Sequence, residues 1–271
     1  MNAVFETPAE VLDLSGHWDL RELDGANCAS MAVPGDVHSA LIAAGVIAHP
    51  YEGRNEVLVQ WVAARDWSIR RTFELSNANA NGWYLDITYL DTIAEVRVND
   101  ILVLEAANSF RRFRPDVSKA LKSGENTIEI IFRSNIAAAA ALQEKQPFYV
   151  PYSTANSPIP NGNMLRKAQC HFGWDWNIAI APFGLYGSIS LKRMAAARIE
   201  HVQAAQVHAD DFSSVDVEVT LTLEALCKGT VSVALSFAGE HRVAALNCEQ
   251  CCARKHTSDD NFNRSPIAPR R

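Results

Sequence analysis

The sequence predicts an all-β protein, and three observations lead to this prediction. Runs of alternating apolar and polar residues recur through the first two thirds of the chain, as they do in half-buried strands. Turn residues bound these runs. Helical signal is limited to Val37–Ala44, which follows a potential N-cap at Asp36, and to the Ala-rich segment Ile136–Gln143.

The expected strands are short and follow one another closely. In Trp83–Tyr89 every second residue is large and apolar or aromatic, which places one face of a strand in a core. The pair Asn99-Asp100 separates two later runs in the manner of a hairpin turn. The strands expected in this part of the chain are Trp67–Leu75, Trp83–Tyr89, Ala94–Val98, Ile101–Leu104, Thr127–Phe132 and Leu185–Leu191.

The segment from Gln146 to Ile180 interrupts this series. It contains several prolines and shows no sustained period. A loop of that length inside a compact domain is usually functional or disordered. Its aromatic residues favour an ordered loop with a function.

A second pattern begins near Ala197, where the runs Ile199–Val207, Val215–Leu223 and Thr230–Phe237 alternate between polar turns. This spacing is typical of an immunoglobulin-like sandwich, which needs about seven strands. Few apolar residues follow Leu246, so we expect the remainder to add nothing to a sheet. The predicted organisation is a β-sandwich domain over residues 1–195, an incomplete immunoglobulin-like domain over 196–246, and a disordered or aberrant tail over 247–271.

Composition excludes several classes of function. Of the 271 residues, 48% are hydrophobic and 21% charged, as in a folded globular protein, and the formal net charge is −6. An acidic balance disfavours nucleic acid as a partner, because phosphate binding needs an excess of Lys and Arg. No apolar run approaches the roughly 18 residues that span a bilayer, and Met1–Leu14 does not resemble a signal peptide. We therefore expect a cytoplasmic protein without a membrane partner.

The six cysteines form no regular disulfide framework, so reduced thiols are expected. Cys248 and Cys251 have the spacing of half a zinc site, but only the isolated His256 could add to them. We expect no metal and no cofactor.

The most informative motif is Gly173-Trp174-Asp175-Trp176. Aromatic rings stack on the apolar face of a pyranose, and a carboxylate accepts hydrogen bonds from adjacent hydroxyls, so the motif suits a carbohydrate site. The alternative is structural, with both tryptophans in the core of a strand and Asp175 capping a turn. The motif alone does not decide between the two.

Together with three other segments, this motif resembles the amino-terminal region of β-mannosidases, in the clan of glycoside hydrolase family 2. The resemblance covers roughly Leu12 to Arg193 and continues more weakly to about Phe237. The upstream Arg166-Lys-Ala-Gln and the Gly-Trp-Asp-Trp element are the parts specific to the mannosidase branch. The other segments, which indicate only the wider clan, are Pro34–His38, Arg65–Phe73 and Asn108–Phe113.

The resemblance implies a jelly-roll, galactose-binding-like sandwich whose loop reaches into the active site of a separate (β/α)₈ barrel. Trp174, Asp175 and Trp176 then become the residues that contact a β-mannoside. Retaining hydrolysis in the family uses two barrel glutamates about 5 Å apart, and these would lie outside this chain. Where some relatives have Gly-Pro after the second Trp, this chain has Asn177, which changes the path of the loop.

No residue of this chain replaces the barrel glutamates. Glu95, Glu129 and Glu218 lie in alternating strands and are expected to face solvent. The function implied is therefore that of an amino-terminal fragment of a β-mannosidase, inactive by itself. Two alternatives stay open: a free-standing carbohydrate-binding module, and the nonfunctional product of an interrupted gene.

Overall fold

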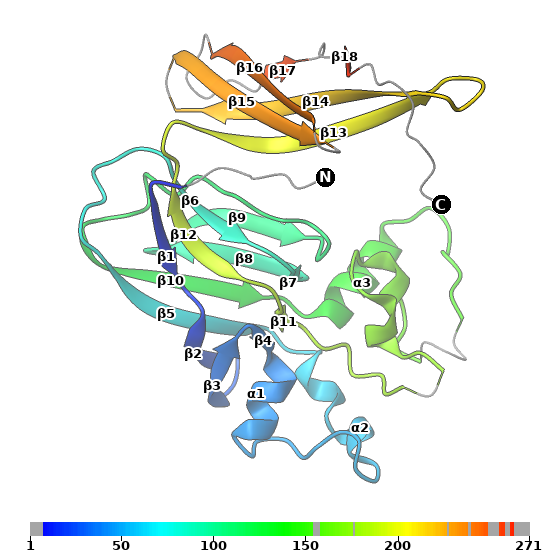
Figure 1. The fold of residues 1–271 in the computed structure, drawn as a ribbon. Coiled ribbons are helices and arrows are strands. Elements are labelled where there is room, and N and C mark those ends of the chain that lie inside the picture. The colour runs from blue at the N-terminus through cyan, green and yellow to red at the C-terminus, as the bar shows by residue number, and fades with distance from the viewer. Residues whose placement is uncertain are drawn as a thin grey trace. The chain divides into compact units, whose positions relative to one another are not determined.

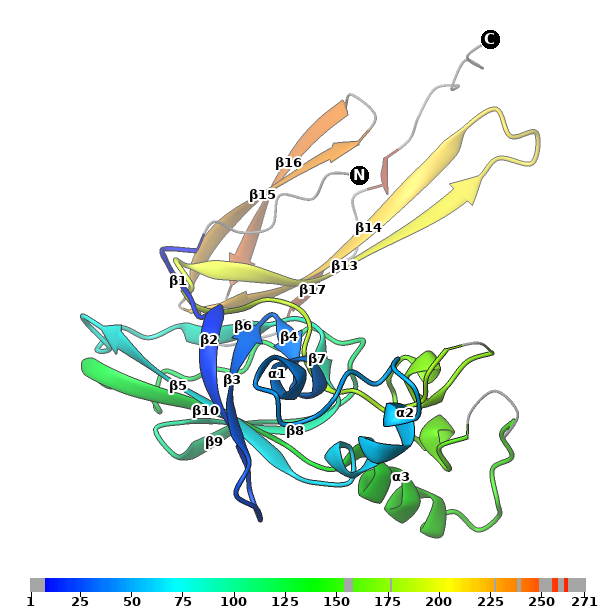
Figure 2. The same ribbon diagram turned by 90° about the horizontal axis from the view of Figure 1, so that it is seen from below.

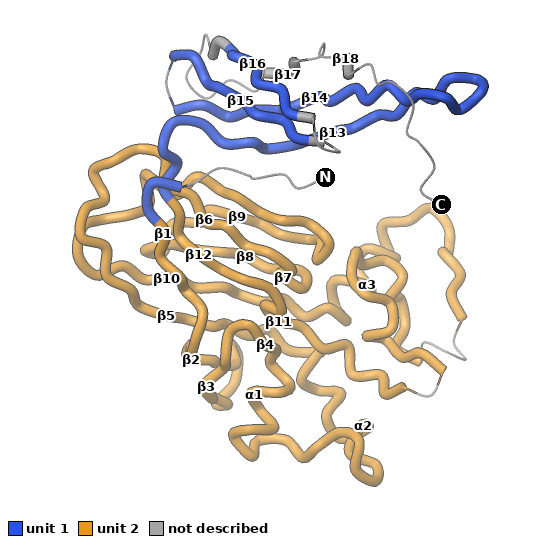
Figure 3. The backbone as a smooth tube through the Cα atoms, viewed as in Figure 1, with its two compact units in different colours: residues 1–10, 193–271 blue, residues 11–192 orange. Residues whose placement is uncertain are grey.

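The computed structural model describes residues 8–153, 158–175, 177–226, 228–237, 240–248, 255–257 and 261–262. The chain divides into two compact units, which Figure 3 colours separately. The larger unit comprises residues 11–192, and the smaller comprises residues 1–10 and 193–271. None of the described helices is long and apolar enough to cross a membrane.

An antiparallel six-stranded sheet forms one side of the larger unit, in the order β3-β2-β5-β10-β8-β9. In register, β10 pairs with β5 on one side and with β8 on the other. Apolar residues on alternate positions of β2, β8 and β10 are buried, so each of these strands has one inward face, whereas β9 at the edge buries only Ala106. The strands are β2 (Gly16–Glu22), β3 (Cys28–Val33), β5 (Trp67–Leu75), β8 (Ile93–Val98), β9 (Ile101–Ala107) and β10 (Gly124–Phe132).

Two three-stranded sheets, β1-β12-β6 and β4-β11-β7, complete the sandwich. In Figure 1, β12 crosses in front of β10. Buried residues of these sheets and of the six-stranded sheet belong to one continuous hydrophobic core. The strands are β1 (Glu10–Asp13), β4 (Gly35–Asp36), β6 (Trp83–Ile87), β7 (Leu90–Asp91), β11 (Gly184–Leu185) and β12 (Ile189–Arg193).

Short helices flank the sandwich. The side chain of Asp36 caps α1 by accepting a hydrogen bond from the Ser39 amide at 2.9 Å. The segments containing α2 and α3 lie toward the same end of the larger unit in Figures 1 and 2. The helices are α1 (Val37–Ala43), α2 (Asn55–Leu58), η1 (Gln60–Val62), α3 (Asn135–Glu144), η2 (Gly162–Met164) and η3 (Gln169–Phe172).

The smaller unit has a much smaller core. Its buried centre is formed by Val215, Val217 and Val219, with three partly buried neighbours. β14 pairs with β13, β17 and β18, whereas β15 pairs with β16 in a separate two-stranded sheet. The strands are β13 (Ala197–His208), β14 (Val215–Ala225), β15 (Gly229–Phe237), β16 (Glu240–Cys248), β17 (Lys255–Thr257) and β18 (Asn261–Phe262).

The all-β class is confirmed, with two differences in detail. The strand expected over Leu185–Leu191 is two strands in different sheets, because the chain passes Thr88 so closely at Gly187 that an added Cβ would lie 2.2 Å from the Thr88 carbonyl oxygen. The expectation that nothing after Leu246 joins a sheet is wrong, since β17 and β18 pair with β14. Backbone hydrogen bonds to a strand edge do not require apolar side chains.

Candidate functional site

The loop that contains the predicted sugar-binding motif leaves the sandwich beside Asn108 and Ser109. The Ser109 amide donates to the Arg166 carbonyl at 2.9 Å, and Asn108 forms a parallel bridge with Arg166. After η3, Gly173 adopts a φ of 107°, which only glycine reaches easily. A tight turn follows, closed by a 2.7 Å hydrogen bond from the Asn177 amide to the Trp174 carbonyl.

The turn presents its side chains to solvent. Trp174 is 56% exposed, and Asp175 is exposed in a left-handed conformation with φ of 38°. The core interpretation, with a buried Trp174 and a satisfied carboxylate, therefore does not hold for these two residues. Trp176, the third predicted site residue, lies outside the described residues.

The returning arm of the loop is held by residues that sequence analysis did not identify. The Tyr51 hydroxyl donates to Asn177 Oδ1 at 2.7 Å. Further along, Glu56 Oε1 accepts from the Ala179 amide at 2.7 Å, and Gln60 Nε2 donates to the Ala179 carbonyl at 2.7 Å. These contacts join residues more than 100 positions apart, so no local pattern could indicate them. The sequence offered one signal for these contacts, which was Asn177 at the position where some relatives have glycine.

A buried charged group lies at the base of the loop. The side chains of Lys167 and Asp91 are both 0% exposed, and Lys167 Nζ lies 3.2 Å from Asp91 Oδ2. Nζ also donates to the Pro182 carbonyl at 2.6 Å and lies 5.5 Å from the centroid of the Phe172 ring. Burial lowers the pKa of Lys167, and the adjacent Asp91 carboxylate opposes that shift.

Aromatic and imidazole rings surround this pair. His171 Nδ1 lies 3.2 Å from Asp91 Oδ2, and the His171 ring is 6.0 Å from that of Tyr186. Burial raises the pKa of Tyr186 far above its usual range, so its hydroxyl stays protonated. His38 is also buried, and burial lowers its pKa to about 4.

The strand glutamates have the surface positions that the sequence predicts. Glu218 is exposed, and Glu95 and Glu129 are partly buried on strand faces. Hydrogen bonds from Arg133 and Arg97 hold the pKa of Glu95 below its usual range. A carboxyl group held in its charged form is poorly suited to protonate a leaving group near neutral pH.

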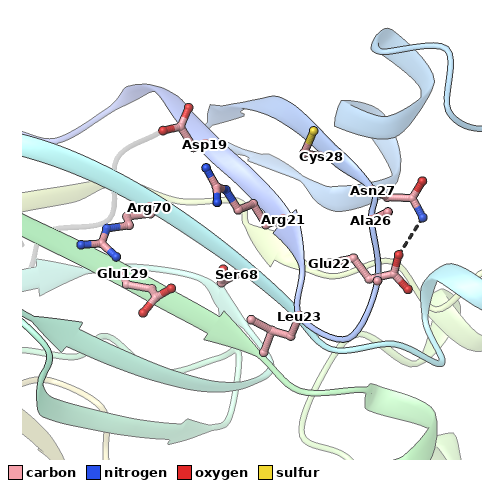
Figure 4. Close-up of a pocket in the computed structure, with 11 residues that line it drawn as sticks. Asp19, Arg21, Glu22, Leu23, Ala26, Asn27, Cys28, Ser68, Arg70 and Glu129 are labelled. Carbon is pink, nitrogen blue, oxygen red and sulfur yellow. Dashed lines mark hydrogen bonds between the residues drawn. The ribbon is translucent and has the colours of Figure 1, made fainter.

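Figure 4 shows a separate hollow on the outer face of the six-stranded sheet, with a volume of about 840 Å³. Charged groups of both signs line it, among them Asp19, Arg21, Arg70 and Glu129. Its eleven lining residues include no aromatic side chain that could stack on a sugar. The exposed turn at Trp174 is therefore the stronger candidate for a carbohydrate site.

Residues 18–187 match the model of the glycosyl hydrolase 2 galactose-binding domain-like family. The chain belongs to this family. A probable β-mannosidase of Caenorhabditis elegans is 32% identical over 189 residues, which are 67% of this chain and 21% of that protein. The β-mannosidase of Bos taurus is 25% identical over 236 residues, or 85% of this chain and 27% of that protein. The chain thus spans about a quarter of these relatives or less.

Solved structures agree with this membership. The β-D-mannosidase of Dictyoglomus thermophilum superposes with a TM-score of 0.78 at 26% identity, over 95% of this chain and 31% of that one. The exo-chitosanase CsxA of Amycolatopsis orientalis, at 13% identity and a TM-score of 0.63, shares the fold. This chain is therefore similar to the amino-terminal part of β-mannosidases, as its motifs predict. Its larger unit has the expected sandwich fold.

Proposed function

We propose that this family 2 chain serves a β-mannosidase, which hydrolyses terminal β-D-mannose residues with retention. It supplies substrate-contacting residues from the loop at Trp174 and Asp175, with Trp176 as the third. The catalytic glutamates belong to a (β/α)₈ barrel outside these 271 residues. The observation that carries the proposal is the exposure of Trp174 and Asp175 on a turn whose two arms are fixed to the sandwich.

The chemistry of the turn suits a bound sugar. An exposed indole offers a face for the C–H groups of a pyranose, and the Asp175 carboxylate accepts hydrogen bonds from sugar hydroxyls. Within the described part of the chain, no hydrogen bond or ion pair engages that carboxylate. It is available to a ligand that approaches from solvent or from a neighbouring domain.

The test is Asp175→Ala in a full-length β-mannosidase rebuilt with this chain as its amino-terminal part. Loss of a charged hydrogen bond to the sugar in the transition state should lower kcat/KM for an aryl β-mannoside. The corresponding activation free energy should rise by about 2–4 kcal/mol. The melting temperature should change little, because the carboxylate is exposed. Asp24→Ala, which removes another exposed carboxylate of the same unit, is the matched control and should leave both quantities unchanged.

A melting temperature lowered by many degrees with an unchanged kcat/KM would show that Asp175 is structural. The proposal would then fail at its central residue.

A second candidate is a carbohydrate-binding module that acts by itself. One observation favours it: residues of the larger unit alone fix both arms of the loop, so the turn needs no other domain to form. Retention of the 271-residue chain on immobilised mannan, abolished by Trp174→Ala, would support this function. Equal retention of both proteins would exclude the loop as the binding site.

A further inference from the structure

The ion pair between Lys167 and Asp91 at the base of the loop is fully buried. Removing two charges from water is costly, and an apolar pair of similar volume often gives equal or greater stability. Stability alone is therefore a weak explanation for the pair. The contacts that Lys167 and Asp91 make with the loop therefore need a separate explanation.

Those contacts join the two arms of the loop. Lys167 lies on the arm that leaves the sandwich, and its ammonium donates to the carbonyl of Pro182 on the arm that returns. The segment 168–181 between them contains Trp174 and Asp175. The same ammonium contacts Asp91 of β7, whose neighbouring strand in the sheet is β11. One cation thus links both arms to the sandwich.

His171 adds a second link of the same kind. Its Nδ1 lies 3.2 Å from the Asp91 carboxylate, and its carbonyl accepts a 2.8 Å hydrogen bond from the Ala181 amide. Asp91 therefore faces two groups of the departing arm. Lys167 Nζ lies within ion-pair distance of Asp91 Oδ2 but not in hydrogen-bond geometry. The hydrogen bond to the Pro182 carbonyl therefore fixes the orientation of the Lys167 ammonium.

We propose that Lys167 and Asp91 are positioning residues that fix the two arms of the loop and so orient Trp174 and Asp175 toward the sugar. This inference rests on the proposed function for its last step. The first step, the fixing of the loop, concerns this chain alone and is measurable without substrate.

The first experiment is hydrogen exchange on the 271-residue chain carrying Lys167→Met together with Asp91→Asn. The double substitution avoids leaving one buried charge unpaired, which would be strongly destabilising. The loop amides with hydrogen bonds, Asn177 and Ala181, should exchange at least about tenfold faster, while those of β5 keep their rates. Lys167→Gln with Asp91→Asn is the second variant, whose shorter polar side chain should restore part of the protection.

The control is Arg133→Met with Glu95→Gln, which removes a partly exposed ion pair of the same unit, at 2.6 Å, together with the contacts of Arg133 with Asp66 and of Glu95 with Arg97. It should leave exchange at Asn177 and Ala181 unchanged. Unchanged loop exchange in both Lys167 variants would overturn the proposal. So would an increase of the same factor in β5, because that would reflect loss of global stability.

The second experiment measures kcat/KM for an aryl β-mannoside in the rebuilt full-length enzyme. The double substitution Lys167→Met/Asp91→Asn should lower kcat/KM at least about tenfold. In a protein that already carries Asp175→Ala, the same double substitution should lower kcat/KM much less, because both changes act through the Asp175 carboxylate. Full additivity with Asp175→Ala would overturn the orienting role. If Asp175→Ala alone has no effect, the proposed function fails, while the exchange result still decides whether Lys167 fixes the loop.

Discussion

His38 has an unusual environment for a histidine. It is 2% exposed, its ring packs edge-on against Phe183, and within the described residues neither ring nitrogen has a hydrogen-bond partner. Burial lowers its pKa to about 4 despite the opposing charge of Asp36. This neutral, buried ring therefore has a structural role in the core of the larger unit.

The chain should therefore lose stability in mild acid through His38. Its pKa is about 4 in the folded state and about 6.5 when unfolded, so the unfolded state binds more protons between these values. The stabilising effect of the neutral ring is complete above about pH 6.5 and falls as the pH drops toward 4. Between pH 7 and pH 5 we expect a loss of about 2 kcal/mol in the free energy of unfolding.

Denaturant unfolding at the two pH values measures this loss, and His38→Leu should remove most of it. Val37→Ala, at the neighbouring buried position of α1, should lower stability equally at both pH values. Carboxylates with lowered pKa, such as Glu95, stabilise the folded state above their unfolded pKa of about 4.5 and lose that contribution only as the pH falls below it, so they add little to the difference between pH 7 and pH 5. An unaltered pH dependence in His38→Leu would contradict the assignment.

Among the structural elements, strands with one buried face were predictable, whereas contacts between distant segments were not. β5 runs over Trp67–Leu75 as the alternation predicts. The Asn99-Asp100 turn has φ of 48° and 64°, the left-handed pair that short hairpins favour. The exposure of Asp175 follows from the resemblance to β-mannosidases and not from the motif alone, and neither indicates the contacts that hold the loop. Tyr51 and Asp91 reach the loop through tertiary folding, which leaves no period in the sequence.

The strands β15 and β16 of the smaller unit have little support from other strands. β15 and β16 form a two-stranded sheet, and such a sheet is marginally stable alone. We expect amides in β15 to exchange on the order of 100-fold faster than those in β6, whose five residues are all buried. Hydrogen exchange with peptide resolution tests this, with β5 as the internal standard. Protection in β15 equal to that in β6 would show that the unit is complete as it stands.

At the scale of the whole molecule, binding and bond cleavage are separable properties. The described residues form β-sandwich sheets and short helices, and the proposed sugar contacts occupy one loop of the larger unit. Retaining hydrolysis requires two carboxyl groups about 5 Å apart, one of them protonated when the leaving group departs. Asp86, the buried carboxylate of β6, does not fit the second requirement, because hydrogen bonds from Arg112 and Lys192 hold its pKa below the usual range.

The 271-residue chain should therefore show no β-mannosidase activity. In the proposed function Trp174 and Asp175 contact a sugar, but contact without an acid and a nucleophile accelerates neither protonation of the leaving group nor formation of a glycosyl-enzyme intermediate. Release of the aryl alcohol from an aryl β-mannoside measures the activity, with the rebuilt full-length enzyme as positive control. Turnover by contaminating hydrolases would survive Asp175→Ala in this chain. Turnover that copurifies with the chain and disappears in Asp175→Ala would instead place catalysis within these residues. It would contradict the proposal that the loop contacts the sugar while a separate barrel supplies the catalytic glutamates.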